Sequence, residues 1–314
     1  MSHAAFWSGL LSAFVLLMPP VAAGAQSSGL SEGFFLEGYG ELGLADTTDR
    51  ADAYYRTDID LGFRPADGTG LGLELGFDSF GEQGLHANAL YPSLSYNSFI
   101  GRFSIGNPRS VVERGYGPTM VFSNSTQVDT LFRLAFGSAV NSGLWQGGDS
   151  YGIRYDGALG DALIGASAHR INTAGSDMSS YALAFHTPVF QNRSSTSIAV
   201  FGSVERVESG GKGRTGYSLG AEAQMEKLHG ALRYRKSPLA ASTELLEGLL
   251  DYALNERFKL SLGLAHERST DATNFYGVGA QYDFLENGYI KGSVVDNSTS
   301  GSDPRLDVAV GFRF

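Results

Sequence analysis

The C-terminal stretch Arg305-Leu306-Asp307-Val308-Ala309-Val310-Gly311-Phe312-Arg313-Phe314 alternates large apolar side chains with polar or small ones. Successive side chains of a β-strand point to opposite faces, so this alternation predicts a strand with one apolar face and one polar face. An apolar face suits lipid and a polar face suits water, as in the wall of a transmembrane β-barrel. We therefore expect the chain to end in the closing strand of such a barrel, with Phe314 as its last residue.

The other end of the chain has the features of an export signal. An apolar run occupies residues 4–22 and is followed by Ala23-Gly24-Ala25, which fits the small-residue pattern of a cleavage site before Gln26. Residues 1–25 are therefore predicted to be a cleaved signal peptide, although the first three residues carry no Lys or Arg. The alternative is a retained anchor helix, but Pro19-Pro20 would interrupt it.

The composition narrows the class of protein. The chain has no cysteine, so an exported form must be held together without disulfides. It has 42 Gly, 20 Phe and 15 Tyr but only 18% charged residues, a bias typical of membrane barrels. Beyond the signal, no apolar stretch approaches the roughly 20 residues of a membrane helix, so a spanning chain would have to form a closed barrel. The net charge of −10 argues against a nucleic-acid partner and is compatible with a lumen that favours cations.

From Gly33 onward the chain divides into segments of about ten residues with period-two alternation, the pattern of tilted membrane strands. The predicted strands are 33–44, 53–64, 69–80, 88–98, 100–107, 149–157, 160–171, 178–188, 194–206, 214–225, 228–236, 243–254, 257–268, 273–284, 287–296 and 304–314. An even number places both chain ends on one side of the membrane, and sixteen strands leave room for an aqueous channel. Segment 243–254 is the most ambiguous, because its leucines also fit one face of a helix.

The connections between these strands alternate in character. The tight turns, which we expect on the periplasmic side, are Asp156-Gly157, Met225-Glu226-Lys227 and Asn255-Glu256. The longer polar loops, which we expect on the outside, are 45–52, 207–213 and 297–303. Loops of this size give little external decoration, so an adhesive surface is disfavoured.

One connection, residues 107–148, interrupts the alternation. A loop this long in a compact protein is usually functional or disordered. Its apolar side chains would be costly to leave in water, which favours order. They are Tyr116, Met120, Val121, Phe122, Leu131, Phe132, Leu134, Phe136 and Trp145. We expect the segment to fold into the barrel lumen, where it would bury these groups and narrow the pore.

The order of these elements resembles the trimeric general diffusion porins of Gram-negative outer membranes. The resemblance is carried by Ser93-Leu94-Ser95-Tyr96, by Gly101-Arg102-Phe103-Ser104-Ile105-Gly106-Asn107, and by Ser150-Tyr151-Gly152-Ile153-Arg154-Tyr155-Asp156 after the long loop. It implies an all-β transmembrane antiparallel barrel whose third extracellular loop forms a constriction, here about 107–148. It also implies a homotrimer in outer-membrane lipid and lipopolysaccharide, inserted by the assembly machinery that recognises a terminal aromatic such as Phe314.

The same resemblance implies a function and a set of site residues. Such porins let ions and small hydrophilic solutes diffuse passively and are not enzymes; their acidic loop residues face basic wall residues. Carried over by position, the loop carboxylates are Glu113 and Asp129, and the wall cations are Arg56 and Arg102. The chain departs from this split, because the loop also holds basic residues and the early wall holds acidic ones. The loop cations are Arg109, Arg114 and Arg133, and the acidic wall residues include Asp58 and Glu74, with Arg154, Arg233 and Arg235 as further wall candidates.

Two alternatives remain open at this stage. A track of inward aromatic residues would favour a channel with a binding site for one solute class, but Tyr54, Phe80 and Phe201 are too scattered in the sequence to form one. A barrel hydrolase would need a nucleophile and a base in contact, and Ser167 and His169 share a strand face without that geometry being required. No cofactor is indicated, and carboxylates at the mouth that could bind divalent cations lack ligand spacing.

Overall fold

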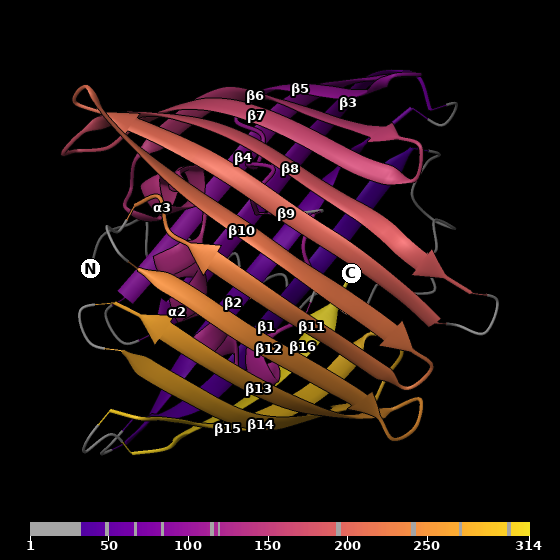
Figure 1. Cartoon of the computed structure of the whole chain (residues 1–314), viewed down its shortest axis with the longest axis vertical. Coiled ribbons are helices and arrows are strands. Elements are labelled where there is room, and N and C mark those ends of the chain that lie inside the picture. The colour runs from indigo at the N-terminus through magenta and orange to yellow at the C-terminus, as the bar shows by residue number, and fades with distance from the viewer. Residues whose placement is uncertain are drawn as a thin grey trace.

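Antiparallel strands form a closed ring in which each strand pairs with its neighbours in sequence and β1 pairs with β16 (Figure 1). The computed structural model describes residues 33–47, 50–65, 68–82, 85–113, 116–118, 120–192, 196–239, 243–269, 272–299 and 303–314. The predicted signal peptide lies outside these residues. The predicted all-β barrel of sixteen strands is confirmed.

The strands follow the predicted segments closely. They are β1 Phe34–Thr47, β2 Arg50–Phe63, β3 Gly70–Glu82, β4 Leu85–Ser98, β5 Gly101–Gly106, β6 Asp149–Leu159, β7 Ala162–Asn172, β8 Asp177–Gln191, β9 Thr196–Ser209, β10 Lys212–Met225, β11 Leu228–Lys236, β12 Glu244–Ala253, β13 Phe258–Arg268, β14 Thr273–Asp283, β15 Gly288–Asn297 and β16 Arg305–Arg313.

The two faces of the wall differ as the alternation predicts. Leu71, Leu94 and Ile105 project outward and are 73%, 58% and 61% exposed. Most side chains of the opposite face are polar and buried. On several strands that lie far apart in the ring, these side chains contact the same segment, residues 107–148. That face is therefore the inner face of the barrel.

Three predicted connections are wrong in detail. The predicted loop 45–52 is mostly strand, because β1 continues to Thr47 and β2 begins at Arg50. Asp156-Gly157, predicted as a tight turn, lies within β6, which continues to Leu159; the turn forms at Gly160, whose φ is +62°. The predicted loop 207–213 is mostly strand, because Gly210 and Gly211 adopt φ values of +57° and +76° and close the hairpin in two residues. Extended strands therefore replace what local composition suggested was loop.

The ambiguous segment 243–254 is a strand, β12, paired with β11 and β13. Its helix-like leucine spacing arises because leucines occur on both of its faces. Leu246 and Leu250 face outward, whereas Leu245 and Leu249 are buried on the inner face.

Residues 107–148 contain a short 3-10 helix, η1 (Phe122–Asn124), and the helices α2 (Thr126–Phe136) and α3 (Ala139–Trp145). Ser125 and Ser138 cap the two α-helices by accepting hydrogen bonds from Val128 N and Asn141 N. Figure 1 shows both helices among the strands of the ring. None of the helices in the described part of the chain is long and apolar enough to cross a membrane.

The apolar side chains of this segment pack on two parts of the inner face. One cluster joins Phe122, Val128, Phe132 and Phe136 to Leu245, Leu249 and other residues of the wall. A second joins Val140, Leu144 and Trp145 of α3 to Ala87, Tyr91, Ile171 and Val207. Burial of these groups accounts for the ordered conformation of the segment.

Glycines on β14 allow η1 to pack directly against the backbone of the wall. Gly277 and Gly279 lie under Ser123, and a Cβ atom on Gly279 would overlap the Ser123 carbonyl oxygen. Ser123 itself has a φ of +44°, so its backbone has little freedom to shift.

We expect Gly279→Ala to lower the free energy of unfolding by about 1–3 kcal/mol, because the added methyl forces η1 away from the wall. Urea titration of the barrel in lipid vesicles measures the change. Gly248→Ala is the matched control, since its added Cβ would lie 3.9 Å from Leu232 Cδ1, an ordinary contact. Equal stability of the two variants would contradict the close packing of η1 on β14.

Candidate functional site

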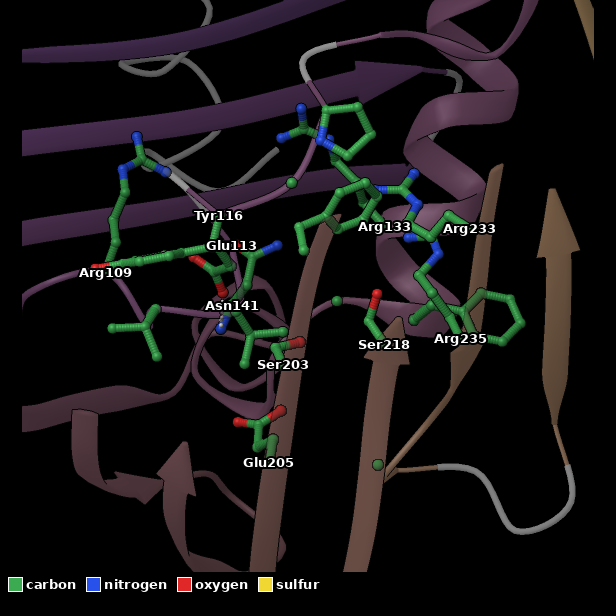
Figure 2. A pocket seen from close by; sticks show the side chains of 18 of the residues that line it. Arg109, Glu113, Tyr116, Arg133, Asn141, Ser203, Glu205, Ser218, Arg233 and Arg235 are labelled. Carbon is green, nitrogen blue, oxygen red and sulfur yellow. Dashed lines mark hydrogen bonds between the residues drawn. The ribbon is translucent and has the colours of Figure 1, made fainter. Parts of the chain in front are cut away.

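A cavity of about 360 Å³ lies between residues 107–148 and the inner face of the wall (Figure 2). Strands β9, β10 and β11 form one side of it. The remaining lining comes from α2, α3 and the chain before them, with Tyr39, Asp58 and Asp78 of β1, β2 and β3. Its polar and charged lining residues include Asp58, Arg109, Glu113, Asp129, Arg133, Asn141, Ser203, Glu205, Ser218, Arg233 and Arg235.

Two guanidinium groups on β11 share one carboxylate. Alternation along β11 places Arg233 and Arg235 on the inner face, and Glu247 lies beside them on β12 because Arg233 and Glu247 are register partners. Arg235 Nη2 donates to Glu247 Oε2 at 2.8 Å, and Arg233 donates to Glu247 Oε1. Glu247 is 1% exposed. Two positive charges and one negative charge leave this part of the wall cationic.

Helix α2 adds a third guanidinium group, which is balanced by acids. Arg133 Nε lies 2.9 Å from Asp129 Oδ2 one turn earlier, and Arg133 Nη1 lies 3.4 Å from Asp58 Oδ2. Burial by itself raises the pKa of Asp129, but Arg133 and more distant guanidinium groups outweigh burial and lower that pKa below its ordinary value. Asp129 is therefore ionised and tied to Arg133.

Two carboxyl groups that line the cavity are held by the start of α3. Glu113 accepts hydrogen bonds from Ser138 Oγ and, at 3.2 Å, from Asn141 N. Glu205 on β9 accepts from Ala139 N at 3.2 Å and from Ser180 Oγ at 2.5 Å. Burial raises the pKa of Glu113 to about 7, although Ser138 and Arg109 oppose the shift. The charge on Glu113 thus changes near neutral pH.

The other predicted loop cations have different placements. Arg109 is 8% exposed and its guanidinium group binds Asp58 at 2.8 Å and Asp60 at 3.0 Å. It lines the cavity, but its positive charge is balanced by these two carboxylates. Arg114 lies outside the described residues.

The early wall cations form separate ion pairs. Arg56 Nη2 lies 2.9 Å from Asp78 Oδ1, and the two side chains are 1% and 2% exposed. Arg102 binds Glu74 at 2.5 Å and Asp156 at 3.1 Å, and Arg154 binds Asp156 at 2.6 Å. Arg102, Glu74 and Arg154 line a second inner cavity of about 180 Å³, whose lining does not include the loop carboxylates Glu113 and Asp129.

Several lining residues lie outside the set selected from the sequence. Glu205, Ser203 and Ser218 occupy inner-face positions of β9 and β10, but isolated polar residues on a barrel strand are expected everywhere on that face. The pair Arg233 and Arg235 carried a stronger signal, because two arginines two positions apart on one strand must share a face.

Ser167 and His169 make contacts that differ from those of a catalytic pair. Ser167 Oγ lies 3.4 Å from Ser110 Oγ, and His169 Nε2 lies 2.8 Å from the Pro108 carbonyl oxygen. Both side chains thus hold the start of the long segment against β7.

Comparison with known proteins gives structural matches alone. No family model and no curated protein matches the sequence. Among solved structures, two engineered variants of Rh. blastica porin match with TM-scores of 0.62 at 16% and 18% identity, each covering 90% of this chain and 100% of the other. A triple mutant of Rhodopseudomonas blastica porin matches with a TM-score of 0.59 at 15% identity and the same coverage. At such identities the likeness establishes the fold, which is that of a porin barrel.

Proposed function

We propose that the chain forms a water-filled channel in the outer membrane of a Gram-negative cell, through which ions and small hydrophilic solutes diffuse passively. The observation that supports this most directly is the division of the wall, with an apolar outer face and a charged inner face that borders cavities. A barrel of sixteen strands is wide enough for such a passage. No bond is made or broken, so selectivity follows from width and electric field.

We propose that residues 107–148 are the constriction loop of this channel. This proposal is supported by the hydrogen bonds that the segment makes with inner-face residues of strands that lie far apart in the ring. Thr126 Oγ1 donates to Glu41 on β1 at 2.5 Å, Tyr91 on β4 donates to Asn141 at 2.6 Å, and Asn124 donates to Ser261 on β13 at 2.7 Å. Glu113, Asp129, Arg109 and Arg133 would then border the narrowest part of the path.

The resemblance to general porins leads us to propose a homotrimer, inserted through recognition of Phe314. In the barrel, Phe314 N donates to the Gly38 carbonyl oxygen at 2.9 Å, which ties the terminal residue to β1. This bond supports a role of the last residue in closure.

The decisive experiment records single channels of the purified protein in a planar bilayer. Large ohmic steps in groups of three, with a reversal potential under a salt gradient, would support an open trimeric channel. A correctly folded barrel that gives no steps would refute passive diffusion through an open pore.

We expect the cation preference of the channel to rise as pH increases from 6 to 8. The pKa of Glu113 is raised to about 7, so its carboxyl group is mostly neutral at the lower pH and mostly ionised at the higher one. The reversal potential in a salt gradient, measured in steps of half a pH unit, gives the midpoint. Glu113→Gln should remove the change, and a Glu113→Gln profile identical to that of the wild type would assign it to another group.

We expect N-terminal sequencing of the protein purified from outer membranes to begin at Gln26. The small residues Ala23-Gly24-Ala25 fit the site that signal peptidase cleaves. A chain that begins at Met1 would instead indicate a retained anchor.

A further inference from the structure

Three inner-face positions lie side by side across the wall of the larger cavity. The strand register pairs Ser203 on β9 with Ser218 on β10, and Ser218 with Arg235 on β11. All three line the cavity, and Figure 2 shows the two serines on neighbouring strands with Arg235 beside them. Two hydroxyl groups and a guanidinium group thus offer hydrogen-bond donors to one space.

The charge of this row is not neutralised. Arg235 and Arg233 both use Glu247 as their acidic partner, and the buried carboxylate cannot match two guanidinium groups. Arg133, the other guanidinium group nearby, is paired with Asp129. The cluster of Arg233, Arg235 and Glu247 therefore has a net charge of +1, which Asp129 of α2 partly offsets, although the whole chain has a net charge of −10. Local charge, and not the net charge, governs attraction of a solute to this wall.

Arg235 is also fixed in position before any solute arrives. Its guanidinium group is held by Glu247 on one side, and its Cζ lies 5.4 Å from the centre of the Phe136 ring of α2. A side chain ordered in this way loses little conformational entropy on binding.

The part of the cavity lining beside α3 has the opposite character. Glu113 in the chain before the helices and Glu205, two residues beyond Ser203 on β9, present carboxyl groups there, and these would repel a second anionic group. A solute that suits both sides carries one oxyanion and, at its other end, a hydroxyl or ammonium donor.

We infer that the row of Ser203, Ser218 and Arg235 on the inner wall binds the oxyanion group of a small hydroxylated or aminated solute, and that Arg235 determines this specificity. The inference rests on the proposed channel function and names the class of solute that the channel favours. A carboxylate and a phosphate share the recognised chemistry, since each offers oxygens to a guanidinium group. Ser203 and Ser218 would donate to the same group.

The test uses lactate and lactamide, which have similar size and differ in charge. We expect lactate to block single-channel current in a concentration-dependent manner and lactamide to have little effect. Arg235→Gln should raise the half-blocking concentration of lactate about tenfold, the scale expected for one charge-assisted hydrogen bond. Arg206→Gln is the matched control, because Arg206 lies on the outer side of β9, is 54% exposed and pairs with Glu208 at 2.8 Å. Its half-blocking concentration should equal that of the wild type.

Three further measurements make the test independent of a single variant. Ser218→Ala should weaken the block several-fold without removing a charge, and inorganic phosphate tests the second source of an oxyanion. Calorimetric titration of the detergent-solubilised barrel compares lactate with lactamide without a conductance readout. If the channel gives full-sized steps and its current is blocked equally by lactate, phosphate and lactamide, the binding site is refuted but the proposed channel function is not. Absence of steps would overturn the channel itself.

Discussion

Replacing Arg56 by alanine is expected to lower the free energy of unfolding by about 3–5 kcal/mol, because it leaves the Asp78 carboxylate buried without its cation. Arg56 and Asp78 are 1% and 2% exposed, with 2.9 Å between Nη2 and Oδ1. The guanidinium group also lies 5.3 Å from the centre of the Trp145 ring on α3, so the change removes a contact between the wall and the long segment.

Urea titration of the folded barrel in lipid vesicles measures this effect, with the loss of the compact electrophoretic form as the signal. Arg206→Ala is the control, since its ion pair with Glu208 is exposed on both sides and contributes about 0.2–1 kcal/mol. The double variant Arg56→Met with Asp78→Leu should recover most of the stability, because neither charge remains. An Arg56→Ala variant as stable as Arg206→Ala would show that water reaches Asp78.

Local alternation predicts strands well where each strand has one apolar and one polar face. Residues 228–236 were predicted as a strand and form β11 over the same residues. The prediction fails in detail at Asp156-Gly157, which was predicted as a turn. Gly157 lies within a strand, and its missing side chain leaves space for the ring of Tyr155. Composition alone cannot distinguish these two uses of glycine.

The helices of the long segment were not predicted, although part of their signal is local. Ser125 precedes α2 as its cap, and Asp129 and Arg133 are spaced as a helical ion pair. The apolar residues of α2 face a wall that comes from the far end of the chain. The segment therefore gains most of its stability from tertiary contacts that the local sequence does not contain.

Charge pairing was the least predictable part of the candidate site. Resemblance places Arg56 and Arg102 opposite Glu113 and Asp129, but strand register gives each of the two arginines a nearer acid on the wall. Arg233 and Glu247 face each other only because β11 and β12 pair in one register. A shift of one residue would move every such group to the other face, so partners follow from the sheet and not from the type of residue.

Strand β16, whose alternating sequence predicts the barrel, also binds the start of α2. Asp307 on β16 is 2% exposed and accepts hydrogen bonds from Tyr54 Oη, from Ser125 Oγ at 3.0 Å and from Gln127 N at 3.2 Å. Glu41 on β1 binds the neighbouring Thr126 in the same way. These two acids fix the point where the segment enters its first α-helix, α2.

We expect Asp307→Ala to release the start of α2 and increase single-channel conductance, because the helix can then move away from the wall. Each buried donor left without an acceptor costs about 1–3 kcal/mol, so the free energy of unfolding should fall by several kcal/mol in total. Paired measurements of step size in a bilayer and of urea stability separate a mobile segment from a failed barrel. Asp307→Asn keeps one acceptor oxygen and should give an intermediate result.

Asp296→Ala is the matched control, since Asp296 is exposed near the end of the adjacent strand β15. It should leave both step size and stability unchanged. If Asp307→Ala behaves like this control, the apolar cluster around Phe122 and Phe132 holds α2 by itself. A larger step with little change in barrel stability would instead show that the segment is a separable restriction, since the wall remains closed when its anchor is lost.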